Sequence, residues 1–406
     1  MYVYENRQLI FNRTQPQQAC HPSATGFSLP SGHASWVTLL FVRLDQLDYF
    51  LPKSQIAQHP LERRSDSRLL LLDRYSGEFE GQSFSELPRL LRGDELLVLN
   101  NARVIPARLF GRRLGVHSDP APRSTRKEHL TGTVEVFLAK RIADDTWEAL
   151  VRPGRKMKTG ERVLFGEGEL EAEVIARGEL GARTLRFVSR DAQTLGEHLE
   201  RLGHVPLPPY IDREDEPSDR ERYQTVFASR PGAIAAPTAG LHFTDEILED
   251  IRGRGCEIAE ITLEVGLGTF QPIHTETLEA HVMHGEKYEI SEEAACRIAA
   301  ARTAKRPVIA VGTTVVRALE DSALRAQSAG AEQPLLHGKA EARLFIAPGF
   351  AFRIVNALLT NFHLPRSTLL ALVCAFAGRE HVLGAYRHAV ESGYRFYSYG
   401  DCMLIR

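Results

Sequence analysis

The sequence predicts an α/β fold that is interrupted by a separate all-β insert. The pattern of apolar and polar residues changes twice along the 406 residues, and this prediction depends on those two changes. Between about residues 108 and 190, short alternating segments are separated by Gly, Asp and Pro, which is typical of a small barrel or sandwich. Before and after this insert, strand patterns alternate with helical patterns, which indicates an α/β layer. The chain is long enough for two or three domains with a sizeable core.

The composition limits the class of protein. Hydrophobic residues make up 43% and charged residues 25%, and the net charge of -2 argues against a generally basic nucleic-acid coat while allowing a local basic patch. The five cysteines are scattered without a CxxC pair, which favours a reduced cytosolic protein over a disulfide framework or a zinc knuckle. No apolar run approaches the ~20 residues of a membrane span. We therefore expect a cytoplasmic protein without a membrane segment.

Residues 1–43 differ from the remainder of the chain. They are polar, rich in Pro, Ser and Gln, and lack both the helical and the strand period. Patterned sequence begins near Val42, and a GTG codon at this position could serve as an alternative start codon. We expect a disordered extension, or upstream sequence included by a misplaced start.

The elements of the α/β part, residues 44–107 and 191–406, can be read in order. "ELLVLN" is a predicted strand that ends at Asn100, and Pro106 breaks the chain before the insert of residues 108–190. After the insert, "CEIAEITLEV" is a second strand and "RPVIAV" a third, followed directly by the helix "GTTVVRALEDSALRAQ". The apolar helix "STLLALVCAFAG" ends at Gly378.

Two strand-to-helix turns carry more polar residues than a connection requires. "GAIAAPTAGLHFTDEIL" places Pro237, Thr238, Gly240 and His242 between a strand and a helix, with Thr244 or Asp245 as the helix cap. "VIAVGTTVVRAL" places Gly312 after a strand, where Thr313 or Thr314 can cap the next helix. The simpler interpretation is a pair of capped helices. The functional one is that free N–H groups and hydroxyls face a ligand in a shared crevice at the carboxyl edge of the sheet.

A third turn resembles a nucleotide-binding motif only weakly. In "ITLEVGLGTFQPI", Glu264, Gly266 and Gly268 imitate the acidic-Gly-x-Gly turn that binds S-adenosylmethionine in Rossmann-type methyltransferases. Phe270 stands where the third glycine belongs, and Pro272 lies where the helix should already run. A tight turn after a strand explains the pattern equally well, and an S-adenosylmethionine-dependent RNA methyltransferase remains the alternative.

Titratable and polar groups interrupt several other patterned stretches. "HVMHGEKYEI" contains His281, His284 and Glu286, whose spacing differs from HExxH and favours acid–base or hydrogen-bonding roles over a metal site. "TNFHLPRSTLL" places Asn361 and His363 between apolar runs, and "SGYRFYSYGDCMLI" places an aspartate, at position 401, beside a terminal strand. Unsatisfied polar groups in a core cost ~1–3 kcal/mol each. The number of such interruptions favours a site over internal architecture.

Basic residues gather at the join with the insert and on one of its turns. An RNA phosphate backbone would need such a local patch on an otherwise neutral protein, and a non-catalytic RNA-binding module would need it too. The candidate contacts are Arg103, Arg108, Arg152, Arg155, Lys156 and Lys158.

Taken together, the motifs resemble one family. The matching pieces are "RVIPARL", "PLPPYI", "RYQTVFA", "AAPTAGLHFT", "VGLGTFQPI", "AVGTTVVRALE", "LFIAPGFAF", "TNFHLPRSTLL" and "YRFYSYGDCMLI". They run colinearly from about Leu44 to Ile405 and resemble the S-adenosylmethionine:tRNA ribosyltransferase-isomerases. Glu264 stands where the family usually has His, Ala102 where it has Thr, and Cys402 where Ala is common.

The resemblance implies a fold and a reaction. The implied fold is an α/β catalytic domain interrupted by a small antiparallel β-barrel domain. The implied reaction transfers and isomerises the ribosyl moiety of S-adenosylmethionine onto the aminomethyl group of 7-aminomethyl-7-deazaguanine in the anticodon loop of tRNA. Epoxyqueuosine-tRNA forms and adenine and methionine leave. The resemblance further implies a monomer, with S-adenosylmethionine as co-substrate and no metal.

This reaction needs groups that move protons and groups that hold the donor. The acid–base candidates are His242, which we favour, His281, His284, Glu286, His363 and Asp401. The candidates for binding S-adenosylmethionine are Thr238, Gly240, Phe243, Gly266, Gly268, Thr269, Gly312, Thr313, Thr314 and Asn361. The sulfonium would lie well over an aromatic face, for which Phe243, Phe270, Phe362 and Tyr399 are available.

Overall fold

The computed structural model describes residues 43–116, 132–178, 181–264, 266 and 285–406. The prediction for residues 1–43 therefore falls almost wholly outside the described residues. Five predicted site or turn residues also lie outside them: Gly268, Thr269, Phe270, His281 and His284.

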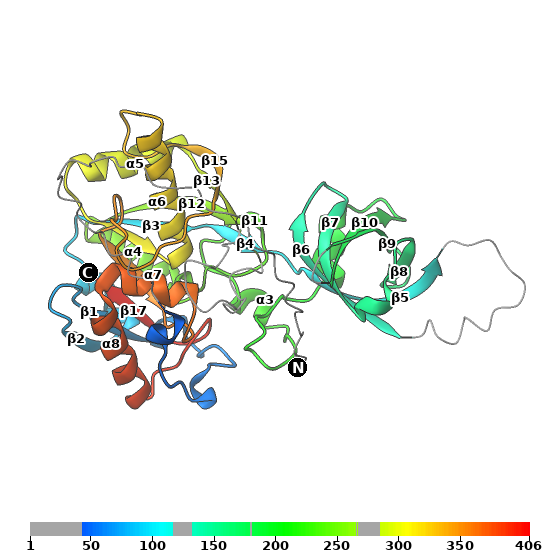
Figure 1. Ribbon diagram of the computed structural model, residues 1–406, viewed down its shortest axis with the longest axis horizontal. Helices are drawn as coiled ribbons and strands as arrows, with labels where there is room; N and C mark the ends of the chain where they lie inside the picture. Colours follow the sequence, from blue (N-terminus) through cyan, green and yellow to red (C-terminus); the bar gives the residue numbers. More distant parts are fainter. Residues whose placement is uncertain (1–42, 117–131, 179–180, 265, 267–284) are drawn as a thin grey trace, which may run out of the picture. The chain divides into compact units, whose positions relative to one another are not determined.

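A nine-stranded mixed sheet forms the centre of the α/β part (Figure 1). Its order is β15 (Gly338–Ala342), β13 (Glu286–Ile290), β12 (Glu257–Glu264), β3 (Leu96–Asn100), β14 (Val308–Val311), β16 (Ala357–Asn361), β17 (Cys402–Ile405), β1 (Arg68–Leu72) and β2 (Phe79–Ser83). The central strands β12, β3, β14 and β16 are parallel, whereas β13, β15 and β2 pair antiparallel at the edges. Every residue of β3 and β14 is buried, as expected for parallel strands with both faces covered.

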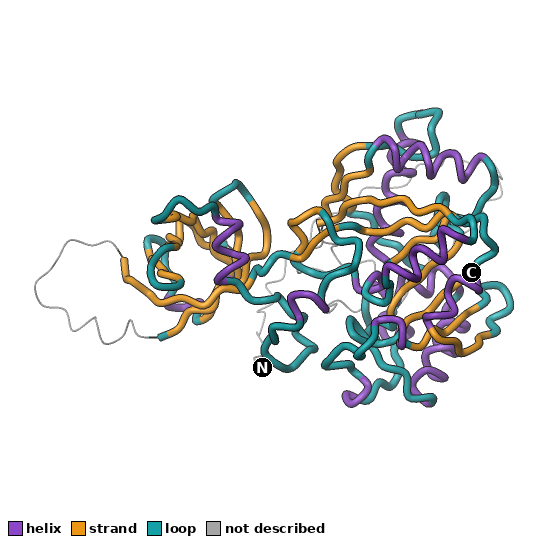
Figure 2. Tube along the Cα trace, turned by 180° about the vertical axis from the view of Figure 1, so that it is seen from behind, coloured by secondary structure: helices purple, strands orange, loops and turns teal. Residues whose placement is uncertain are grey.

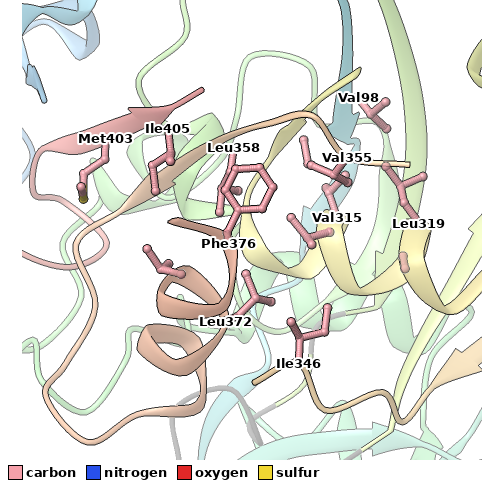
Figure 3. Close-up of a cluster of buried hydrophobic side chains, with 14 of the residues drawn as sticks. Val98, Val315, Leu319, Ile346, Val355, Leu358, Leu372, Phe376, Met403 and Ile405 are labelled. Atoms are coloured by element: carbon pink, nitrogen blue, oxygen red, sulfur yellow. The ribbon is translucent and has the colours of Figure 1, made fainter. Parts of the chain in front are cut away.

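Helices cover both faces of this sheet. On one face lie α1 (Leu87–Leu90) and α4 (Asp245–Gly253), whose Ile247 and Ile251 pack with Leu97 and Leu99. The other face carries α5 (Glu292–Thr303), α6 (Thr313–Ser328), α7 (Thr368–Ala377) and α8 (Arg379–Glu391). Figure 3 shows Val315 and Leu319 of α6 and Leu372 and Phe376 of α7 gathered on the sheet residues of this second core. The sheet with helices on both sides confirms the predicted α/β layer.

The starts of the helices differ in one respect that matters for the site. Thr244 caps α4, as predicted, by accepting a hydrogen bond from the Ile247 N–H, and Ser367 caps α7 in the same way. In contrast, α6 begins after Gly312, which has φ 99° and supplies no side-chain cap. The prediction that Thr313 or Thr314 caps this helix is wrong, because both residues already lie inside its first turn. The first N–H groups of α6 are therefore left without a capping side chain.

The insert is a closed antiparallel barrel. Of the two architectures that the sequence allowed, a barrel or a sandwich, the barrel is therefore the one formed. Its strands are β5 (Arg108–Val116), β6 (Thr133–Arg141), β7 (Thr146–Arg152), β8 (Glu161–Phe165), β9 (Leu170–Arg177) and β10 (Ala182–Ser189), in the order β10-β7-β6-β5-β8-β9. Val134, Val136, Val163 and Phe165 belong to its buried core. The fold class is confirmed, while the proposed domain boundaries at residues 107/108 and 190/191 stay a prediction.

The remaining elements are short. They are α2 (Leu195–Leu202), α3 (Asp219–Arg222), the parallel pair β4 (Ala102–Val104) and β11 (Arg230–Ala233), and the 3-10 turns η1 (Leu44–Leu47), η2 (Lys53–Gln55), η3 (Arg64–Asp66), η4 (Phe84–Glu86), η6 (Gly154–Lys156) and η8 (Thr238–Gly240). Figure 2 shows how much of the chain between the helices and strands is loop. Within the described ranges no single helix is long and apolar enough to cross a membrane; only α7 and α8 together reach that length and composition, and they are bent by 116°.

Candidate active site

A cavity of about 120 Å³ lies where the parallel strands β14 and β16 end. We call it the β14–β16 cavity and define it by Thr238, Gly312, Thr313, Asn361, His363 and Tyr397, which are among its lining residues. Adjacent parallel strands with helices beyond their carboxyl ends create such a crevice at the edge of a sheet. The two predicted strand-to-helix turns thus meet in one cavity, through η8 on one side and the start of α6 on the other.

The start of α6 presents polar groups to this cavity. Gly312, Thr313 and Thr314 all line it, and the helix has 16 residues and no side-chain cap. Uncapped N–H groups at a helix start carry partial positive charge and donate hydrogen bonds to a ligand. The positive φ of Gly312 lets the chain leave β14 and enter α6 directly, with its N–H donating to the Leu359 carbonyl at 2.8 Å.

Asn361, the last residue of β16, is buried at 2% exposure and lines the same cavity. Its side-chain nitrogen faces three acceptors: His242 Nε2 at 3.1 Å, the Tyr397 carbonyl at 3.1 Å and the Asp401 carbonyl at 3.4 Å. Because all three groups accept hydrogen bonds, the orientation of the amide follows from the network.

His242, the favoured acid–base candidate, does not line the cavity. It is 3% exposed, and its Nδ1 lies 2.7 Å from Ser67 Oγ while its Nε2 accepts from Asn361. Burial lowers the pKa of His242 to about 3, with smaller contributions from Arg64 and Arg395. A neutral ring with both nitrogens bonded to protein groups is suited to orient Asn361, while the acid–base role of His242 stays a prediction.

Glu286 and Asp401 also lie away from the cavity lining. Glu286 forms an ion pair with Arg317 at 2.8 Å, and both side chains are buried. The Asp401 carboxylate accepts the Arg68 and Arg395 N–H groups, each at 2.8 Å, although burial raises the pKa of Asp401. The Asp401 contacts join the loop of residues 395–401 to β1, and the Glu286 contact joins β13 to α6. The acid–base roles of the two carboxylates stay predictions.

Four of the six acid–base candidates lie within the described residues, and among these four only His363 lines the cavity. Its Nε2 lies 2.8 Å from Thr360 Oγ1, and its backbone N–H donates to Tyr386 Oη at 3.1 Å. Burial lowers the pKa of His363 to about 3. A neutral imidazole with Nε2 engaged leaves Nδ1 as the ring atom available to a ligand.

The predicted ligand-binding residues separate into two groups. Five of them line the cavity: Thr238, Gly312, Thr313, Thr314 and Asn361. Gly240 is not among the lining residues, and a Cβ there would lie 2.7 Å from the Phe227 ring and 2.8 Å from Thr225, so packing alone already requires glycine. Phe243 belongs to the core, packed edge-on against Phe84 and Phe227.

Gly266 is not among the residues that line the cavity. Of the aromatic candidates, Phe362 lines it, while Tyr399 lines a second, smaller pocket together with His242. Among the residues that the structure describes, no group of three or more His, Cys, Asp or Glu side chains could hold a metal ion.

Tyr210, Tyr397 and Ser398 were not among the predicted site residues, yet they line the cavity from segments far from both turns. The rings of Tyr210 and Tyr397 lie 4.2 Å apart, and Tyr210 Oη is 2.7 Å from Ser398 Oγ. No period or spacing marks these residues as site residues. The one signal was the interruption of an apolar run by "YRFYSYGD".

The turn of the barrel that carries Arg155, Lys156 and Lys158, which we call the basic turn, is exposed, and a buried side chain binds its backbone. Arg155, Lys156 and Lys158 are exposed, and within the described part of the chain no carboxylate pairs with them. Arg183, only 3% exposed, donates to the carbonyls of Gly154 and Met157 at 2.6 Å each. The shape of this turn is therefore fixed by a buried arginine.

The other basic candidates lie close to carboxylates. Arg108 pairs with Glu135 at 2.8 Å, Arg152 with the same carboxylate at 3.9 Å, and Arg103 with Glu200 at 3.4 Å. These pairs lessen the local positive charge, so the three unpaired cations of the basic turn are the stronger candidates for the predicted phosphate contacts.

Comparison with known proteins places the chain. Residues 44–405 match the family of queuosine biosynthesis proteins. The chain is 53% identical over 368 residues to the S-adenosylmethionine:tRNA ribosyltransferase-isomerase of Solibacter usitatus, covering 90% of this chain and 100% of the relative. It is 48% identical over 364 residues to the enzyme of that name from Moorella thermoacetica, with the same coverage. A crystal structure of S-adenosylmethionine tRNA ribosyltransferase from Thermotoga maritima shares 35% identity over 89% of this chain and 100% of that one, with a TM-score of 0.47. The chain belongs to the family of queuosine biosynthesis proteins.

Proposed function

We propose that this protein is an S-adenosylmethionine:tRNA ribosyltransferase-isomerase. It joins the ribosyl moiety of S-adenosylmethionine to the aminomethyl group of 7-aminomethyl-7-deazaguanine in tRNA, forms the epoxyqueuosine ring and releases adenine and methionine. The observation that carries the proposal is the match over residues 44–405, within which relatives of that name are 53% and 48% identical along their full lengths.

The β14–β16 cavity supports this reaction as the place where the donor binds. It combines an uncapped helix start, the hydroxyls of Thr238, Thr313 and Thr314, and the aromatic rings of Tyr210 and Phe362. Its volume of about 120 Å³ is below the ~300–1,000 Å³ of pockets that enclose a drug-sized ligand. We therefore propose that it holds one part of S-adenosylmethionine, with Thr238, Gly312, Thr313, Thr314 and Asn361 as contacts.

The residues that we propose for proton transfer differ from the one favoured on sequence grounds. A general base works best when its pKa is near the operating pH, and the burial of His242 and His363 lowers the pKa of each to about 3. Both rings are therefore poor proton acceptors, although His363 can hydrogen-bond a ligand through Nδ1. We propose His281 and His284, outside the described residues, as the groups that accept and return protons.

The tRNA would contact the basic turn of the barrel. Arg155, Lys156 and Lys158 would bind phosphates that flank the anticodon loop and so position the modified base, which unpaired loop bases can present to a pocket. Action on tRNA also supports a cytoplasmic location, and a monomer is the simplest assembly for a single cavity. Analytical ultracentrifugation would test the oligomeric state.

A methyltransferase with the same donor is the competing reaction. The prediction of a methyltransferase depended on the turn after β12, yet Gly266 does not line the cavity and the names of the relatives give a different reaction. We would incubate the protein with S-adenosylmethionine and tRNA carrying 7-aminomethyl-7-deazaguanine, then identify the small products. Adenine and methionine, released only with the modified tRNA, would establish ribosyl transfer, whereas S-adenosylhomocysteine would establish methyl transfer.

A further inference from the structure

Two buried side chains of the β14–β16 cavity carry polar atoms without a partner. Asn361 is 2% and Tyr397 7% exposed, and both line the cavity. Among the described residues, neither Asn361 Oδ1 nor Tyr397 Oη has a hydrogen-bond partner. Buried polar atoms are nearly always satisfied, because leaving one unpaired is destabilising. Because both residues line one cavity, a ligand bound there is the available partner for these two oxygens.

The orientation of Asn361 is set by a chain of matched donors and acceptors. The amide nitrogen donates to His242 Nε2, so His242 Nδ1 carries the proton and donates to Ser67 Oγ at 2.7 Å. Ser67 Oγ in turn donates to the Arg64 carbonyl at 3.1 Å. With the nitrogen engaged on this side, the amide oxygen is the side-chain atom of Asn361 left without a partner among the described residues.

The backbone of Tyr397 is held in an unusual conformation. Its φ is 73°, a value that bulky residues avoid and that persists only where the surroundings impose it. The Tyr397 carbonyl accepts hydrogen bonds from Asn361 and from the Gly400 N–H at 2.9 Å. At Gly400, a Cβ would lie 2.5 Å from the Arg395 carbonyl, so the turn requires glycine there. Strain maintained in this way is typical of functional sites.

We propose that Asn361 Oδ1 and Tyr397 Oη bind the adenosyl moiety of S-adenosylmethionine through its N–H or O–H donors, and that His242 positions Asn361. This inference rests on the proposed function and assigns a ligand contact to Tyr397, which was not among the predicted site residues. The Tyr210 ring, 4.2 Å from that of Tyr397, adds an aromatic wall beside the two polar atoms. A planar base with N–H groups, attached to a hydroxyl-bearing sugar, matches this combination of surfaces.

The substitution Tyr397→Phe tests the proposal because it removes one oxygen and no protein hydrogen bond. With saturating modified tRNA, we expect the KM for S-adenosylmethionine to rise about tenfold, the change produced by losing one hydrogen bond of ~1.4 kcal/mol. The kcat should change less than about twofold, and the thermal midpoint should stay the same or rise. The matched control is Tyr394→Phe, since Tyr394 is fully buried and does not line the cavity. Its KM should match that of the wild type.

The outcomes separate the two levels of the proposal. A wild-type protein that releases no adenine with modified tRNA overturns the proposed function and this inference with it. An active wild type with the same KM in Tyr397→Phe overturns this inference alone. A raised KM accompanied by a lowered thermal midpoint would mean that the hydroxyl stabilises the fold, which contradicts the assignment.

Two analogues of S-adenosylmethionine identify the donor. One lacks the 6-amino group of adenine and the other lacks the ribose 2′-hydroxyl. The analogue whose KM is the same in the wild type and in Tyr397→Phe has lost the group that this hydroxyl binds. If the substitution raises the KM of both analogues as much as that of S-adenosylmethionine, neither group is the partner and the assignment is wrong.

Discussion

Asn361 Nδ2 lies 3.1 Å from His242 Nε2, so the histidine of one strand-to-helix turn orients the amide at the end of a strand 119 residues later. Both residues are buried, and one of them lines the β14–β16 cavity. The contact joins the face of the sheet that carries α4 to the cavity at its carboxyl edge.

The replacement of His242 should distinguish positioning from proton transfer. In His242→Phe, Asn361 loses an acceptor, and we expect kcat/KM for S-adenosylmethionine to fall about fivefold to tenfold, the effect of one neutral hydrogen bond of ~1 kcal/mol. His242→Gln keeps an acceptor and a donor in the same place and should restore most of this loss. The pH profile of kcat should be the same in His242→Gln and the wild type. Disappearance of its acidic limb would show that His242 transfers a proton.

Stability should depend on pH through the two buried histidines. The pKa of His242 and of His363 is about 3 in the folded protein, against ~6.5 in the unfolded chain. Below pH ~6.5 the unfolded chain binds protons that the folded protein does not. Each histidine therefore contributes stability that is complete above pH ~6.5 and is lost, by ~1.4 kcal/mol per pH unit, as the pH falls towards 3.

Urea unfolding of the wild type and His242→Gln between pH 7.5 and 4.5 would measure this contribution. The difference between the two free energies of unfolding should shrink or change sign at low pH, in favour of the variant. A constant difference would mean that His242 titrates alike in the folded and unfolded states.

Gly312 should be intolerant of a side chain for conformational reasons. Its φ of 99° and ψ of 148° fall in a region that is essentially confined to glycine, whereas the atoms nearest to an added Cβ, Ala239 Cβ and Thr314 Oγ1, would be 3.8 Å away. We expect Gly312→Ala to lower the free energy of unfolding by ~1–3 kcal/mol and to disturb the start of α6. Chemical denaturation measures the first effect, and the KM for S-adenosylmethionine the second.

The matched control is Gly384→Ala within α8. No atom lies within 4 Å of a Cβ at this position, and alanine in a helix interior is favoured over glycine by ~0.5–1 kcal/mol. Stabilisation there and destabilisation at Gly312 would confirm the conformational explanation. Equal effects at the two sites would contradict it.

Charge reversal on the basic turn should weaken tRNA binding. Arg155→Glu combined with Lys156→Glu removes two unpaired cations, so affinity should fall roughly tenfold at low salt and the salt dependence should become shallower by ~0.7–0.9 per lost phosphate contact. Filter binding over a salt series measures both quantities. Lys140→Glu reverses an exposed charge on β6 of the same barrel and should have a smaller effect. Unchanged affinity in the double variant would exclude this turn as a tRNA contact.

Glu264, where the family usually has His, should matter little to the fold. Its side chain is 57% exposed at the end of β12 and lies 4.0 Å from Lys287 Nζ, and it does not line the cavity. We expect Glu264→His to change the free energy of unfolding by less than ~0.5 kcal/mol, as for most surface substitutions. Adenine release should stay within about twofold of the wild type. A large rise in kcat would show that this position takes part in the reaction.

Much of the fold was predictable because its signals are local. Runs such as "ELLVLN" and "RPVIAV" are too apolar for anything but covered strands, and Thr244 and Ser367 precede helices in the positions of N-caps. The short alternating segments between residues 108 and 190 predicted an all-β insert. They could not decide between barrel and sandwich, because closure depends on which strands pair at the edges.

The two turns that line the cavity were likewise marked in the sequence, because each places polar residues between a strand and a helix. Their convergence was not, since Gly312 follows β14 of the nine-stranded sheet, whereas Thr238 follows β11, which pairs with β4 in a separate two-stranded sheet. The tasks of the individual side chains did not follow. Gly240 was assigned to a ligand, yet what it accommodates is the Phe227 ring, a neighbour that no spacing in the turn reveals.

The sequence by itself therefore determined the α/β layer, the all-β insert and the two polar turns between strands and helices, because periodicity, caps and strand ends depend on neighbouring residues. Only the tertiary structure decided that His242 contacts Asn361, that the Asp401 carboxylate accepts a hydrogen bond within the loop of residues 395–401, and that the Tyr397 hydroxyl has no partner among the described residues. Each of these features depends on a hydrogen bond made, or left unmade, by groups brought together in folding. The distance along the chain between such groups leaves no pattern from which the contact can be inferred.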